Sequence, residues 1–254
     1  RRPRPRSSWR TPTSRGGDAR SSFAALSLAP ESPALAEDLQ LLMWFPYGQY
    51  HYAVRGDSDI MVLDDIEGAS VFLGPTGGGA WNHAYGWIKS TTGLDAKAGD
   101  YEAIDANWTT GFQAFLDGSV DVYVNGCLDP CGPFLQFTET ESVRFIGPED
   151  TSGAAEFLGP FRYMDEIPAG SYKNQVNDGP VTSSNTAVGI GINANLPEEL
   201  VYRMTKAFWD NLDKVTSTAP WAKALDVKYA AQKQGMITLH PGAEKYYREV
   251  GAIE

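Results

Sequence analysis

The amino-acid sequence predicts an α/β fold from residue 39 onward, and three observations support this. Short apolar segments of strand length alternate with longer segments in which apolar residues recur every three or four positions. The links between these segments are short and contain glycine or proline. Hydrophobic residues make up 42% of the 254 residues and charged residues 21%, which is typical of a globular protein with a core. Such alternation with short links indicates a sheet covered by helices.

The first half of the pattern predicts strands and helices in turn. The strand at 70–73 is expected to be buried, and it leads into a glycine-rich loop. The following helix is predicted because Trp81, Ala84, Tyr85 and Ile88 fall on one helical face. Residues 41–45 form a short apolar segment. Strands are expected at 47–55, 70–73, 120–124 and 143–146, a helical turn at 62–66 closed by Gly68, and helices at 81–88 and 109–117, the last ended by Gly118.

The second half predicts one bent strand and three helices. Residues 182–193 are rich in Val, Ile and Thr and are interrupted by glycine, which indicates a strand with a bend. Asn195 is expected to cap a helix that continues to Val215, with Glu198 as its capping-box partner. A helix at 221–234, a brief strand at 236–239 and a last helix through Tyr247, entered by a turn that His240 caps, complete the pattern.

Charge is distributed unevenly along the chain. The net charge is −11, but residues 1–20 contain seven Arg and one Asp, so residues 21–254 carry 14 basic and 31 acidic side chains. A body this acidic repels phosphate backbones and anionic lipid, which argues against nucleic acid and membrane surfaces as partners. No apolar segment of about 20 residues is present, so no transmembrane helix is expected.

Residues 1–38 differ from the rest of the chain. They are rich in Arg, Pro, Ser and Ala and have no strand or helix period, which indicates a disordered leader. A basic arm or a transit peptide is the alternative interpretation. No apolar h-region of a secretory signal follows the basic residues.

The strongest candidate site is the loop that joins the strand at 70–73 to the helix at 81–88. Glycines let backbone N–H groups approach a ligand closely, because no Cβ intervenes. The first N–H groups of a helix have no partner within it and carry the positive end of its dipole, so they attract a carboxylate or another anion. The residues expected to contact a ligand here are Thr76, Gly77, Gly78, Gly79 and Asn82. The alternative is a strand-to-helix connection that binds nothing.

Two further candidates lie elsewhere in the chain. Asn125 and Gly126 follow a predicted strand, and ligands of open α/β sheets gather at the carboxyl ends of strands. The alternative for this pair is a simple turn. Tyr172 follows an Ile-Pro-Ala-Gly segment that could bring its hydroxyl to a ligand, and a packed surface tyrosine is the alternative.

Motifs of enzymes and metal proteins are absent from the sequence. His51, His83 and His240 form no His-Glu-x-x-His motif, and no Gly-x-Ser-x-Gly occurs. A general base at His83 is conceivable, but a polar wall of a pocket is the preferred interpretation. Cys127 and Cys131 have no histidine nearby in sequence and do not form a zinc site alone, so a local disulfide and two inert thiols both stay open. No metal or cofactor is expected.

Six segments, in order and sensibly spaced, resemble the TAXI-type solute receptors of TRAP transporters. The segment 71–79 resembles that family's Val-Ser-Leu-Gly-Pro-Pro-Gly-Ser-Gly-Thr loop, and Ile167–Tyr172 resembles its Ile-Pro-Ala-Gly-Thr-Tyr segment. The resemblance covers about residues 39–254. The matching segments are 57–68, 71–79, 115–122, 167–172, 196–202 and 240–247.

The resemblance implies a type II periplasmic binding-protein fold, in which two α/β lobes enclose a ligand cleft. Residues 39–54 and 166–254 would form a first, incomplete lobe, and residues 55–165 the second. Such receptors are periplasmic and are not enzymes, and they deliver small carboxylates or amino acids to the membrane permease of a TRAP transporter. An enzyme on a related two-lobed scaffold, or a truncated fragment without function, are the alternatives.

Overall fold

The structure is a computed structural model, and it describes residues 39–46, 48–127, 130–159, 162–218, 222–223, 225–232 and 237–254. The predicted leader at 1–38 lies outside the described residues. The strands are β1 (Leu39–Pro46), β2 (Gln49–Arg55), β3 (Ser70–Phe72), β4 (Glu102–Ala103), β5 (Val122–Cys127), β6 (Val143–Phe145), β7 (Arg162–Ile167) and β8 (Val181–Asn193). The helices are η1 (Leu63–Ile66), α3 (Gly79–Thr92), α4 (Trp108–Leu116), α5 (Gly132–Phe137), α6 (Ala154–Phe157), α7 (Glu198–Asp210), α8 (Leu212–Thr218), α9 (Val227–Ala230) and α10 (Pro241–Glu249).

Five strands form the larger sheet, in the order β4-β3-β5-β2-β6. Strand β3 runs parallel to β4 and β5, whereas β2 runs antiparallel to β5 and β6. One strand therefore opposes the direction of the other four. This antiparallel strand is β2, which precedes the other four in the sequence and lies between β5 and β6 in the sheet.

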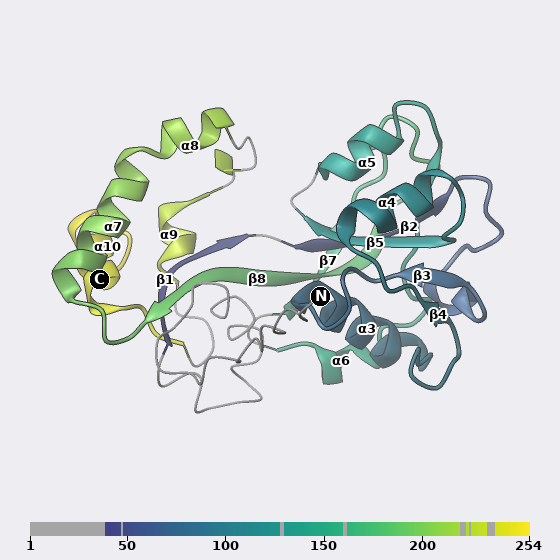
Figure 1. Cartoon of the computed structure of the whole chain (residues 1–254), viewed down its shortest axis with the longest axis horizontal. Helices are drawn as coiled ribbons and strands as arrows, with labels where there is room; N and C mark the ends of the chain where they lie inside the picture. The colour runs from purple at the N-terminus through teal and green to yellow at the C-terminus, as the bar shows by residue number, and fades with distance from the viewer. Residues whose placement is uncertain are drawn as a thin grey trace, which may run out of the picture.

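Both faces of this sheet are covered by helices, as Figure 1 shows for α3 and α6 on one side and α4 and α5 on the other. Side chains alternate between the faces along each strand, because successive residues of a strand point in opposite directions. In β2, Tyr52 and Val54 pack with α3 and α6, whereas Ala53 packs with α4 and α5. Two apolar clusters therefore lie on opposite faces of one sheet.

The smaller sheet has the order β1-β8-β7, and its long middle strand joins the two halves of the molecule (Figure 1). The first part of β8, residues 181–186, pairs with β7, and the second part, residues 187–193, pairs with β1. Strand β1 leads directly into β2 of the larger sheet, through Gly48 with a φ of +117°. Two connections therefore cross between the sheets.

Helices α7 and α10 pack together against β1 and bury the core of the C-terminal half. A Cβ on Gly242 would overlap the carbonyl oxygen of Glu198, so the two helices approach too closely there for a larger residue. The Tyr247 hydroxyl donates to the carbonyl oxygen of Leu42 over 3.0 Å. His240 caps α10, as expected, by accepting a hydrogen bond from the N–H of Gly242.

The structure differs from the predicted elements in this half. Asn195 does not cap the helix, because α7 begins at Glu198 after Pro197 and the Asn195 N–H instead donates to Asn193. The helix expected to continue to Val215 is interrupted at Asn211, so α7 and α8 are separate. Of the helix expected at 221–234, the described residues form only a short helical turn at 222–223 and α9, and parts of that range lie outside the described residues.

The structure also places strand β2 in the larger sheet. The predicted boundary after residue 54 assigned this strand to the same lobe as residues 166–254. Hydrogen bonds of β2 with β5 and β6 instead place residues 49–55 in the same sheet as strands of the segment 55–165. Sequence could not reveal this, because hydrogen-bonded neighbours of β2 lie far along the chain.

Candidate functional site

The loop between β3 and α3 has the backbone that the sequence predicts for a glycine-rich connection. Gly74 and Gly77 have φ angles of +101° and +77°, a region that favours glycine. A Cβ on Gly74 would also lie 3.0 Å from the ring of Trp108. The N–H of Gly78 donates to the carbonyl oxygen of Pro75 over 3.0 Å and closes the turn. Glycine is therefore required here for both conformation and space.

Helix α3 begins at this loop without a side-chain cap. Gly78 is its N-cap residue, and the first bond of the helix runs from the N–H of Asn82 to the Gly78 carbonyl over 3.1 Å. Within the described part of the chain, the N–H groups of Gly77, Gly79 and Ala80 have no hydrogen-bond partner. Gly77 and Gly79 are also exposed. These donors, at the positive end of a 14-residue helix, can bind an anion.

Two side chains of the predicted site lie beside these donors and differ in their contacts. The Thr76 hydroxyl donates to the carboxylate of Asp105 over 2.7 Å, and both residues are exposed. Asp105 thereby places a negative charge next to the loop, which opposes the binding of an anion. Asn82 is exposed on the first turns of α3, and its side-chain amide forms no hydrogen bond to the described residues.

Asn125 and Gly126 lie within β5, so the interpretation of this pair as a turn is wrong. They pair with His51 and Tyr50 of β2, and the Asn125 amide donates to the hydroxyl of Tyr123 over 3.0 Å. A Cβ on Gly126 would lie 2.8 Å from the Tyr50 ring, so this glycine makes room for the packed aromatic ring. Their predicted contact with a ligand stays a prediction.

Tyr172 is not at the surface, because it is 3% exposed within the cluster that lies between the larger sheet and α4 and α5. Its hydroxyl accepts a hydrogen bond from the N–H of Cys131 over 2.7 Å and lies 2.9 Å from Nε2 of His51. The interpretation of Tyr172 as a packed surface residue is therefore wrong, and its predicted contact with a ligand stays a prediction.

His83, on the other hand, joins the glycine-loop helix to the crossing strand. Its Nε2 lies 2.9 Å from the hydroxyl of Ser184 in β8, and its ring stacks on Tyr50 with centroids 3.8 Å apart. Burial, together with the nearby positive charge of Arg162, holds the pKa of His83 well below its ordinary value. This shift favours the neutral imidazole, which is buried, and the interpretation of His83 as a polar wall of a pocket stays a prediction.

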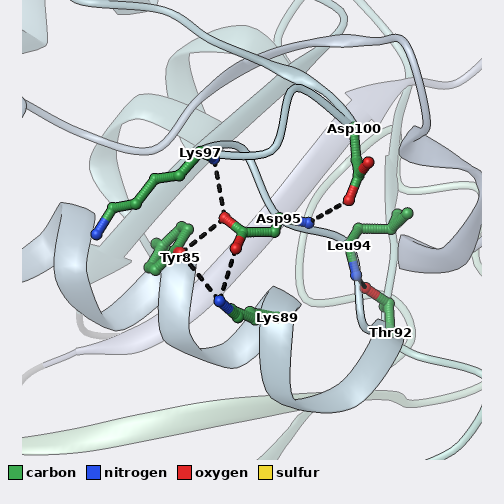
Figure 2. Close-up of polar contacts among 7 residues, drawn as sticks. All are labelled: Tyr85, Lys89, Thr92, Leu94, Asp95, Lys97 and Asp100. Carbon is green, nitrogen blue, oxygen red and sulfur yellow. Dashed lines mark hydrogen bonds and ion pairs between the residues drawn. The ribbon is translucent and has the colours of Figure 1, made fainter.

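The far end of α3 is anchored by a polar network that Figure 2 shows. Asp95 accepts hydrogen bonds from the Tyr85 hydroxyl (2.7 Å), the Lys89 ammonium (2.6 Å) and the N–H of Lys97 (2.8 Å). Lys89 and then Tyr85 lower the pKa of Asp95 to about 2. Gly93, with a φ of +80°, ends the helix just before this loop. The network and the glycine together fix the C-terminal end of the helix whose other end is the candidate site.

None of the described helices is long and apolar enough to cross a membrane. The arrangement of the sheets, helices and crossing strands defines the class of fold. Two sheets covered by helices, joined by crossing strands, with one antiparallel strand inserted in the larger sheet, form the type II periplasmic binding-protein fold, as the sequence predicted.

The chain belongs to the NMT1-like family, whose model matches residues 32–251. Among solved structures, it is similar to the periplasmic sulfonate-binding protein SsuA from Methylobacillus flagellatus KT, with 16% identity over 88% of this chain and 50% of that one and a TM-score of 0.39. It is similar to the aliphatic sulphonate binding protein SsuA from Escherichia coli, with 15% identity over 78% of this chain and 53% of that one and a TM-score of 0.40.

An ancestral arginine-binding protein is similar at 15% identity, over 81% of this chain and 78% of that one, with a TM-score of 0.40. This chain spans about half the length of the two sulfonate-binding proteins.

Proposed function

We propose that this chain is the receptor of a TRAP-type transporter of the TAXI class. It binds a small carboxylate or an amino acid between two α/β lobes in the periplasm and delivers it to a membrane permease, without catalysing a reaction. The first lobe comprises residues 39–54 and 166–254 apart from strand β2, and β2 joins the second lobe of residues 55–165, where it pairs with β5 and β6. Membership of the NMT1-like family and the crossing-strand topology support the proposal.

The observation that carries the proposal is the uncapped start of α3. The exposed N–H groups of Gly77 and Gly79 donate to no acceptor among the described residues, and a carboxylate supplies two oxygens. The solute's own ammonium or second polar group then faces Asp105, whose carboxylate stands beside the loop. This pairing of donors and a carboxylate suits an amino acid better than a simple dianion.

Calorimetric titration of the full chain tests the proposal. The panel contains amino acids, dicarboxylates and aliphatic sulfonates, since a sulfonate also presents several oxygens to backbone donors. We expect at least one amino acid to bind, and circular dichroism establishes that the sample is folded. A folded chain that binds no member of the panel contradicts the proposed function.

A pair of variants at Gly79 then tests the site itself. Gly79 is the first residue of α3, where proline is well tolerated, and Gly78 has the extended conformation that proline requires before it. Gly79→Pro removes one N–H donor, whereas Gly79→Ala keeps it. A lost hydrogen bond to a charged group costs about 1.5–3 kcal/mol, so Gly79→Pro should weaken binding at least about tenfold. Equal affinities of the two variants would place the solute elsewhere.

A further inference from the structure

The connection between β4 and α4 contains a motif for N-linked glycosylation. Asn107, Trp108 and Thr109 form an Asn-x-Thr sequon, whose middle residue is not proline. No other asparagine of the sequence has Ser or Thr at the second position after it. Asp105 adds a carboxylate two residues before the asparagine, which is the additional feature that bacterial oligosaccharyltransferases recognise. Residues 105–109 therefore meet the stricter, bacterial form of the motif.

The fold presents this motif at the surface. Asp105, Asn107, Trp108 and Thr109 are all exposed. Asn107 is the N-cap residue of α4 and has extended backbone, with φ −79° and ψ 168°. A sequon that folding buries is closed to a transferring enzyme. The exposure of these four side chains is therefore the first structural requirement that the chain meets.

The side-chain nitrogen of Asn107, which is the atom that receives a sugar, is free to react. Oδ1 of Asn107 accepts a hydrogen bond from the N–H of Thr110 over 3.0 Å and so caps α4. Because Oδ1 faces the helix, Nδ2 is turned away from it, and Nδ2 donates to no acceptor among the described residues. An N-linked sugar replaces one hydrogen of Nδ2 and leaves Oδ1 unchanged. The helix cap and the sugar are therefore compatible.

The first turn of α4 is held by few hydrogen bonds, which suits an enzyme that binds its acceptor in an extended form. Within the described part of the chain, Asn107 accepts from the N–H of Thr110 through its side chain and from the N–H of Gly111 through its carbonyl, the latter over 2.9 Å. The N–H groups of Trp108 and Thr109 lie in the first turn, where a helix supplies no partner. Unwinding this turn therefore breaks the bonds to Asn107 and leaves the rest of α4 in place.

We propose that Asn107 is an acceptor of N-linked glycosylation in the folded chain. The donor is an oligosaccharide joined through a diphosphate to a membrane lipid. Nδ2 attacks C1 of the first sugar, the C–N bond forms as the bond from C1 to the diphosphate oxygen breaks, and Nδ2 loses one proton to water while the lipid diphosphate leaves. The disulfide between Cys127 and Cys131 agrees with passage through an oxidising compartment, where such enzymes act. The predicted solute site plays no part in this chemistry.

Transfer of an oligosaccharide to the purified, folded full chain tests the proposal. The probe is a single-subunit bacterial oligosaccharyltransferase with a lipid-diphosphate oligosaccharide as donor, and mass spectrometry of the intact chain measures the product. We expect the mass to rise by one oligosaccharide and peptide mapping to place it on Asn107. A folded chain whose mass does not change overturns the proposal. Modification that occurs only after denaturation also overturns it, because the fold would then close the motif.

A matched pair of threonine variants isolates the motif. Thr109→Ala removes the hydroxyl that the enzyme recognises but keeps Asn107 and its cap, whereas Thr110→Ala changes the neighbouring exposed threonine and leaves the motif intact. We expect the first variant to lose the modification and the second to retain the wild-type amount. Asp105→Asn should lose most of it, although the new amide still offers an acceptor to the Thr76 hydroxyl. Modification that persists in Thr109→Ala overturns the proposal.

Discussion

The two sheets of the molecule differ in how they are packed. The larger sheet has an apolar cluster on each face, with fully buried Trp87 on one side and fully buried Phe134 on the other. Among the residues that the structure describes, the smaller sheet has one extensive cluster, formed with α7 and α10, and four buried residues in a second cluster around Trp44. Methionine and leucine side chains on α7, at Met204 and Leu200, are more than a third exposed.

This difference indicates where the stability of the chain resides. A sheet buried on both faces excludes more apolar surface from water per strand than a sheet buried mainly on one. The larger sheet therefore buries more apolar surface per strand, and β8 contacts its helix α3 through His83 and Ser184. The glycine loop begins at the end of β3, a buried strand of this larger sheet.

The largest expected effect comes from matched truncations of one phenylalanine in each sheet. Phe145 of β6 is 1% exposed and contacts the rings of His51, Phe134 and Tyr172, whereas Phe45 of β1 is 8% exposed. Phe145→Ala should lower the free energy of unfolding by about 4–5 kcal/mol and Phe45→Ala by about 3 kcal/mol. Chemical denaturation followed by circular dichroism measures both. A larger loss for Phe45→Ala would reverse the comparison.

A smaller effect on the free energy of unfolding is expected when the pH falls, at the contact between His83 of α3 and Ser184 of β8. Burial lowers the pKa of His83 in the folded state, while the unfolded value is near 6.5. The stability from neutral His83 is therefore complete above pH 6.5 and is lost below it, by about 1.4 kcal/mol per pH unit. Denaturation at pH 7.5 and 5.5 should show a smaller difference for His83→Gln than for the wild type. Identical pH dependence would show that His83 stays accessible to protons.

The smallest effect is expected at the exposed network at the end of α3. The folded pKa of Asp95 is about 2, below its ordinary value of 3.8, so its contribution is present above pH 3.8 and is lost as the pH falls through 2. Asp95→Asn should lower the melting temperature slightly at pH 5 and leave it close to the wild-type value at pH 2. An equal loss of melting temperature at both pH values would mean that the asparagine side chain destabilises the chain sterically and that charge has no part in the effect.

Much of the larger sheet and of the helices that cover it could be predicted from the sequence. The helix from 81 to 88 and the strand before it have strong local patterns, and α3 and β3 confirm them. The strand expected at 120–124 corresponds to β5, and Gly118 has the positive φ expected after α4. Local periodicity identified these elements because each buries one continuous apolar face.

Elements without such a pattern were not predicted. Helices α5 and α6 are six and four residues long, too short to show a period. Strand β7 shows no alternation of exposure, because the consecutive residues Tyr163 and Met164 are both exposed, so its sequence resembles a loop. The prediction of one helix at 221–234 merged separate short helical segments, because apolar spacing alone does not reveal where a helix ends.

The candidate site was predicted in part. The glycine loop before α3 has the backbone and the exposed donors that its composition indicated. The sequence placed Asn125 and Gly126 in a turn or at a strand end, but the ladder with β2 keeps both inside the sheet. The cysteines had no histidine nearby in sequence, yet His51 lies beside them because β2 is inserted next to β5.

By itself, the sequence determined the longer helices and strands with a clear apolar period and the glycine turns between them, because these depend on neighbours within a few residues. Only the tertiary structure decided which distant residues meet. The insertion of β2 into the larger sheet brings His51 to Cys127 and Cys131, and the passage of β8 between the sheets brings Ser184 to His83. Strand pairing is a contact between remote parts of the chain, and no local pattern encodes its partner.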